Sequence, residues 1–135
     1  MNERYEAVHT VNHYYDGPRT GVADFQGAPH FYQSEFDYDR DGRDETFLLT
    51  LIDQETFRME LEAWQIWIRW SDAFKTGSVT IDTHPALPID RPRYDELQRM
   101  LKSRLVTDKQ RTVRVKANFR VSGTSQLEVC WTAVT

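Results

Sequence analysis

The residues with the clearest spacing for chemistry form an acidic run, Asp37-Tyr-Asp39-Arg-Asp41-Gly42. Carboxylates at alternating positions can converge on a hard cation such as Ca²⁺, and a glycine after them permits the sharp turn of a calcium loop. The second half of such a loop is missing, because Leu48 stands at the twelfth position, where a bidentate glutamate is expected. A solvated acidic turn between two strands explains the same residues. Asp37, Asp39 and Asp41 are therefore a weak calcium candidate, and no cofactor or other metal is expected.

A second set of polar side chains stands on or beside irregular backbone, where functional groups are often displayed; it comprises Asp16, Arg19, Asp24, His30 and His84. A histidine can act as general acid, general base or ligand near neutral pH, and an arginine can hold an anionic group. In the functional interpretation, Arg19 binds the anion and His30 or His84 transfers the proton. Asp24 or Glu35 would then orient that histidine. In the structural interpretation, the same side chains hydrogen-bond their own turns, with Arg19 paired to Asp16 or Asp24.

The segment from Thr56 to Phe74 predicts a helix that is apolar around most of its circumference. At about 100° per residue its polar side chains gather in one arc, and two apolar stripes fill most of the rest. One stripe holds Phe57, Leu61, Trp64 and Ile68, and the other holds Ala63, Ile66, Trp67, Trp70 and Phe74. We expect Asp53 to cap the N-terminus of this helix and Gly77 to end it. Such a helix is buried on most sides, either within its own domain or against a partner.

Short apolar runs and turn residues predict strands in the N-terminal third. The expected strands are His9–Tyr15, Gly21–Phe25, His30–Phe36 and Phe47–Ile52, separated by the Asp16-Gly17-Pro18 turn, a turn over Gln26–Pro29 and a polar loop over Asp37–Glu45. Gly27 is expected to take a positive φ in the second turn. Beyond the Trp-rich helix, a proline-bounded linker from Thr83 to Pro88 leads to a second helix at Arg91–Leu105, with Asp90 as its cap.

The C-terminus has the most regular strand pattern in the chain. Apolar residues alternate with polar ones from Val113 to Val121 and again from Leu127 to Ala133. A loop between them keeps both apolar sets on one face in a register that pairs Phe119 with Val129, Ala117 with Trp131 and Arg120 with Glu128. The whole order predicts an α+β fold in a single domain, residues 1–135. It would be an antiparallel β-sheet with two α-helices packed on one face.

Charge is unevenly spread along the 135 residues, whose formal net charge is −4. Residues 1–90 carry 7 basic and 17 acidic side chains, whereas residues 91–120 carry 10 basic and 3 acidic ones. Internal pairing explains this better than a nucleic-acid surface on Arg114, Lys116 and Arg120, since the whole chain is acidic. No apolar run suits a membrane span or a signal peptide, and the only cysteine, Cys130, fits a reducing compartment. We therefore expect a cytoplasmic protein without membrane partners, with Cys130 as a packing residue.

Two segments of the chain resemble a small family of uncharacterised bacterial proteins. They are Tyr15-Asp-Gly-Pro-Arg-Thr-Gly-Val-Ala-Asp-Phe-Gln-Gly-Ala-Pro-His30 and Thr83-His-Pro-Ala-Leu-Pro88, together about a sixth of the chain. The resemblance implies a bacterial cytoplasmic protein, carries no known activity and assigns no functional residue. It draws attention to His30 and His84, one in each segment.

No catalytic signature stands out in the sequence, which has no nucleophile elbow, P-loop, dinucleotide fingerprint or CxxC motif. We therefore expect a non-enzymatic binding or protein-interaction module. The apolar surface of the Trp-rich helix favours a homodimer with Ile66, Trp67 and Trp70 at its interface. The plainer interpretation is that this helix is the central core helix of the domain. The rival function is a small-molecule site or enzyme with a cleft between the Asp16–Arg19 turn and the linker around His84.

Overall fold

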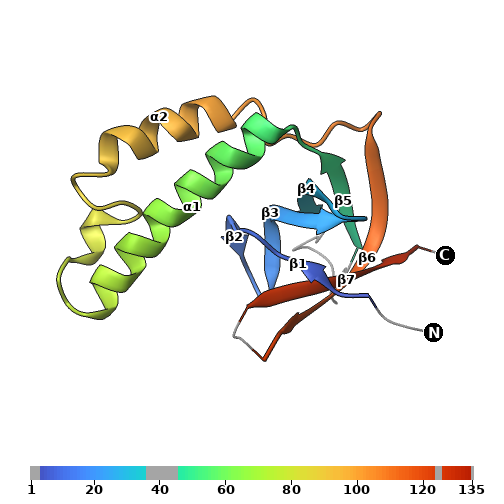
Figure 1. The fold of residues 1–135 in the computed structure, drawn as a ribbon, viewed down its shortest axis with the longest axis horizontal. Coiled ribbons are helices and arrows are strands. Elements are labelled where there is room, and N and C mark those ends of the chain that lie inside the picture. The colour runs from blue at the N-terminus through green and yellow to red at the C-terminus, as the bar shows by residue number, and fades with distance from the viewer. Residues whose placement is uncertain (1–3, 36–45, 124–125, 135) are drawn as a thin grey trace. The chain divides into compact units, whose positions relative to one another are not determined.

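The computed structural model describes residues 4–35, 46–123 and 126–134. The sequence predicts one domain, and the contacts add that the chain forms two compact units. The barrel unit comprises Met1–Asp53 and Val106–Thr135, and the helical unit comprises Gln54–Leu105. Within the described ranges, strands come first, two helices follow and a further pair of strands comes last, in the α+β order predicted from the sequence (Figure 1). None of the helices in the described ranges is long and apolar enough to cross a membrane.

The barrel unit is an antiparallel sheet of seven strands: β1 (Glu6–Ala7), β2 (His13–Tyr14), β3 (Pro18–Phe25), β4 (Ala28–Ser34), β5 (Thr46–Leu51), β6 (Thr112–Val121) and β7 (Leu127–Ala133). Their order across the sheet is β1-β7-β6-β5-β4-β3-β2. The two outermost strands belong to one N-terminal segment. That segment pairs with β7 through Glu6 and Ala7, and with β3 through Val8 and His13. One segment therefore joins both edges of the sheet and closes it into a small barrel (Figure 1).

Alternate side chains of the strands fill the inside of this barrel. The buried cluster consists of Val8, Ala23, Tyr32, Phe47, Leu49, Val115 and Val129. Four rings, those of Tyr32, Phe47, Phe119 and Trp131, contact one another there, with centroids between 5.6 and 6.2 Å apart. Edge-to-face and tilted contacts of this kind stabilise a core beyond the burial of their area. The aromatic residues thus give a small barrel a dense core.

Closure of the barrel depends on a close approach at Gly21. The hydroxyl of Tyr32 donates a hydrogen bond to the carbonyl oxygen of Thr10, 2.9 Å away, beside this glycine. A β-carbon at Gly21 would collide with that carbonyl oxygen and come within 2.6 Å of the tyrosine hydroxyl. Glycine is therefore needed here for space, because it lets the N-terminal segment lie directly against β3.

Both hairpins predicted from the sequence are present. The C-terminal register is confirmed, with Ala117 opposite Trp131, Phe119 opposite Val129 and Arg120 opposite Glu128. The N-terminal hairpin is tighter than predicted, because Gln26 and Gly27 alone form its turn, with φ values of 55° and 81°. Positive φ at both central residues matches the right-handed twist of the flanking strands. Pro29 consequently lies within β4, opposite Asp24, and not in the turn.

The helical unit contains α1 (Gln54–Lys75), a short 3₁₀ turn (Ile81–Thr83) and α2 (Arg91–Leu101). Gly77 ends α1 as predicted, with a φ of 78°, and the Ser78 amide donates back to the carbonyl oxygen of Ala73. The second helix stops four residues before the predicted Leu105. Asp90 precedes that helix, but its side chain makes no capping hydrogen bond. The core of this unit is formed by Met59, Ala63, Ile66, Ala86, Leu97 and Leu101.

Candidate functional site

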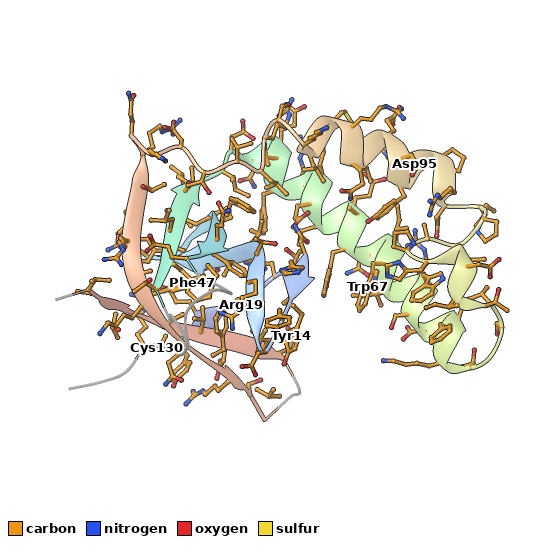
Figure 2. All side chains as sticks on the ribbon, turned by 180° about the vertical axis from the view of Figure 1, so that it is seen from behind. Tyr14, Arg19, Phe47, Trp67, Asp95 and Cys130 are labelled. Carbon is orange, nitrogen blue, oxygen red and sulfur yellow. The ribbon has the colours of Figure 1, made fainter. Side chains whose placement is uncertain are left out.

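Arg19, the expected anion binder, is labelled in Figure 2. It is only 7% exposed and is engaged by its own chain. Its Nε donates to the carbonyl oxygen of Tyr15 at 2.7 Å, and Nη2 donates to that of Asp16 at 3.1 Å. Nη1 donates to the hydroxyl of Ser34 on β4 at 3.2 Å. These bonds hold the turn before β3, where Asp16 and Gly17 both have positive φ. The guanidinium therefore has a clear structural use, which the structural interpretation of the sequence anticipated.

Asp24 lies beside His9, a histidine outside the predicted set of site residues. His9 Nε2 donates to Asp24 Oδ1 at 2.9 Å, and the two side chains are 24% and 27% exposed. The backbone carbonyl of Asp24 accepts a second hydrogen bond, from Trp131 Nε1 at 2.8 Å. Pairing of the N-terminal segment with β3 brings His9 here, since its amide donates to the carbonyl oxygen of Val22. Asp24 thus links three segments of the barrel.

His30 is held within its own hairpin. Its Nδ1 lies 2.9 Å from the carbonyl oxygen of Ala28, and since a carbonyl only accepts, that nitrogen carries the proton. The imidazole meets the ring of Phe25 edge-on, with centroids 5.2 Å apart. Glu35, the other carboxylate considered as an orienting group, accepts from Arg114 Nε at 2.6 Å.

The fifth candidate, His84, belongs to the helical unit, and its ring stands edge-on to that of Trp70 at 4.6 Å. The other four candidates belong to the barrel unit. Among the five, the structure brings together Arg19 and Asp16, through the backbone of the latter. The described ranges contain no group of three or more His, Cys, Asp or Glu side chains suited to a metal ion. The calcium candidates Asp37, Asp39 and Asp41 lie outside the described residues.

Helix α1 buries part of one apolar stripe, including Ala63, Ile66 and Trp70. Ile66 is 1% exposed and Trp70 is 4% exposed. Trp70 Nε1 donates to the hydroxyl of Thr83 at 2.8 Å, and its ring stacks on Phe74. Ile66 packs in a cluster with Leu97 and Leu101 of α2. Two of the three expected interface residues, Ile66 and Trp70, are therefore core residues with little surface to offer a partner.

Helix α1 also carries apolar side chains that the core of this unit does not include, three from the other stripe and Trp67 from the edge of the stripe that holds Ile66 and Trp70. Leu61, Trp64, Trp67 and Ile68 are half-buried, and none belongs to the buried cluster or packs against it. We call these four residues the apolar seam. The rings of Trp64 and Trp67 stack at 5.0 Å with an interplanar angle of 21°. Trp67, labelled in Figure 2, is the one expected interface residue that belongs to the seam.

The polar arc of α1 holds α2 through ion pairs. Arg69 donates to both carboxylate oxygens of Asp90, at 3.0 and 3.1 Å. Arg93 of α2 donates to both oxygens of Glu62, at 2.7 and 2.8 Å, and it also pairs with Glu96. The hydrogen bond from Arg93 lowers the pKa of Glu62 below its ordinary value, against the opposing effect of desolvation.

Ion pairs also engage basic side chains of β6 in the barrel unit. Arg114 pairs with Glu35, and Arg120 pairs with Glu128 while its guanidinium lies 3.4 Å above the centre of the Tyr5 ring. Two of the three basic residues considered for nucleic acid are thus engaged by carboxylates. The internal pairing expected from the charge pattern accounts for them.

Comparisons with protein-family models, with curated proteins and with solved structures find no match to this chain. The resemblance inferred from its two motif segments stays a hypothesis.

Proposed function

We propose that this protein is a non-enzymatic protein-interaction module that binds through the apolar seam of α1. The observation that supports the proposal is the presence of four large apolar side chains, two of them tryptophans, outside the core of their unit. Contiguous apolar surface on a folded protein marks interaction sites, and tryptophan is enriched among the residues that carry most of the binding energy. The stacked Trp64 and Trp67 rings are the natural anchors of such a contact.

The polar candidates favour this proposal over an enzyme or a small-molecule site. Arg19 spans two backbone carbonyls and a hydroxyl, Asp24 holds His9, and Glu35 holds Arg114. Each of these groups already forms hydrogen bonds within the fold. A ligand-binding site would need the same groups for its ligand.

A cytoplasmic location is part of the proposal, supported by the one cysteine, Cys130, which is buried and free.

The proposal is tested by comparing polar substitutions in the seam with one in the core of the same helix. Trp64→Gln and Ile68→Gln alter the seam, and Ile66→Gln is the matched core control. Thermal unfolding is followed by far-ultraviolet circular dichroism in dilute solution, where association is weakest. A polar group in a core costs several kcal/mol, so Ile66→Gln should lower the Tm by roughly 10 °C or more. The seam variants should change the Tm by only about 2 °C.

A loss of Tm in the seam variants as large as that in Ile66→Gln would overturn the proposal. The seam would then be part of the core of the chain, and its apolar character would need no partner.

A further inference from the structure

We infer that the seam binds a second copy of the same chain, with the two α1 helices antiparallel and Gln65 on the two-fold axis. This inference rests on the proposed function and names the partner. It comes from three polar residues, Arg58, Gln65 and Asp72, which follow one another at intervals of seven along α1.

These three residues lie on one flank of the seam. With Phe57 at zero, Arg58, Gln65 and Asp72 fall at about 100°, 80° and 60° around the helix, next to Leu61 at about 40°. All three side chains are exposed. Spacing by seven keeps residues on one side of a helix that packs against another, and charges on such a flank determine the orientation of helix pairs.

Arg58 and Asp72 differ from the other charged residues of the polar arc. Glu62 and Arg69 are engaged by Arg93 and Asp90 in the same chain. Within the described part of the chain, neither Arg58 nor Asp72 forms an ion pair. Contacts within the helical unit therefore account for Glu62 and Arg69. They leave Arg58 and Asp72 available for ion pairs with a second chain.

An antiparallel pair of helices makes the flank complementary to itself. Arg58 and Asp72 each lie seven residues from Gln65, or about 10.5 Å along the helix. A two-fold axis through Gln65 consequently places Arg58 of each copy opposite Asp72 of the other, and symmetry forms this ion pair twice. Gln65 meets its own counterpart at the axis, where an amide can both donate and accept. The seam residues Leu61 and Ile68 then face each other across the axis.

A parallel pair would not pair both charges. In that arrangement the flank with Arg58 and Asp72 faces the opposite flank of the second helix, which carries Glu60, Trp67 and Phe74 at the same interval of seven. Glu60 is buried within its own chain, and Asp72 would lie against aromatic side chains with no guanidinium to meet. Charge complementarity therefore selects the antiparallel arrangement.

The test uses the full chain and two charge reversals, Arg58→Asp and Asp72→Arg, studied by sedimentation velocity. Each variant alone places like charges opposite each other twice, so its dimerisation should weaken about tenfold or more relative to the wild type. Mixed in equal amounts, the two variants should form a heterodimer, because every charge then meets its opposite. The double variant Arg58→Asp/Asp72→Arg should recover dimerisation. Arg99→Asp, the same change at an exposed position near the end of α2, is the control and should have no effect.

Two results would overturn the inference. Neither decides whether the seam is an interaction surface, which the thermal-unfolding experiment tests separately. If the wild type sediments as a monomer at every concentration up to its solubility limit, the partner is not a second copy. If it dimerises but the reversals alone and mixed behave like the wild type, the antiparallel register is wrong.

Discussion

Tyr32 and Thr10 are joined by a hydrogen bond from the tyrosine hydroxyl to the threonine carbonyl oxygen, 2.9 Å long. Tyr32 is fully buried in the middle of β4, and Thr10 belongs to the N-terminal segment that closes the barrel. The bond thus ties the closing segment to a strand that is not its neighbour in the sheet, through the space left by Gly21.

Tyr32→Phe should lower the free energy of unfolding by about 1–2 kcal/mol, since it keeps the ring in the core and leaves a buried carbonyl oxygen without this donor. Chemical denaturation monitored by tryptophan fluorescence measures the change. Tyr14→Phe is the control, because it removes the same hydroxyl from a side chain that is 70% exposed. This variant should leave the free energy of unfolding unchanged. Equal stability of Tyr32→Phe and the wild type would show that the bond is not needed for closure.

Gly21→Ala should be more damaging than Tyr32→Phe, because the added methyl group meets a backbone oxygen that cannot rotate away. Overpacking of this kind costs about 1–3 kcal/mol, and the lost hydrogen bond adds to it. Gly123→Ala is the matched control, since a β-carbon there meets nothing within 4 Å. The free energy of unfolding of the two variants is compared with that of the wild type. If Gly21→Ala is as stable as the wild type, the Thr10 carbonyl oxygen does not approach Gly21 closely.

Removal of the buried guanidinium in Arg19→Met should destabilise the barrel by about 3 kcal/mol, because two turn carbonyls and a hydroxyl lose their donor. Arg19→Lys should rescue little of this loss, since one ammonium group cannot reach three acceptors spread around a planar fork. The comparison separates the structural role from the anion-binding role. A variant that folds with full stability would return Arg19 to the list of possible ligand-binding groups.

The ion pair between Arg93 and Glu62 predicts a small acid-dependent loss of stability in the helical unit. Because the folded-state pKa of Glu62 lies below its ordinary value of 4.5, the pair stabilises the fold above that value, and the contribution is lost as the pH falls through the lowered pKa. Both side chains are 45% exposed, so screening by solvent should keep the effect small. Glu62→Gln should flatten the pH dependence of unfolding in this acidic window. An unchanged pH profile would show that the pair adds nothing in solution.

Local sequence pattern was sufficient for the presence and order of the hairpins and helices, although not for the length of the β3–β4 turn or the end of α2. Alternation over Val113–Val121 and Leu127–Ala133 determines which residues face the core, and together with the length of the loop between them it gives the observed register. Glycine after α1 and a glycine turn between β3 and β4 are equally local signals. Each of these features depends on residues that lie close together in the sequence.

Other features depend on contacts that no local pattern records. Strands β1 and β2 have two residues each, so the closing segment shows no alternation from which its pairing with both β7 and β3 can be read. The pairing of His9 with Asp24 follows from that closure and was therefore missed.

The two stripes of α1 are equally apolar, and periodicity does not say which of them α2 covers. Asp90 looked like a cap, but the guanidinium of Arg69 offers its carboxylate two hydrogen bonds and a full charge.

The most direct measurement of the central claim is sedimentation velocity on the wild type and on the double variant Trp64→Gln/Ile68→Gln, with circular dichroism of the same samples. If the seam binds a second copy of the chain, the wild type dimerises at concentrations where the double variant is monomeric, and both have the same helix content. A double variant that loses helix content, or two proteins with the same association state, would contradict the claim.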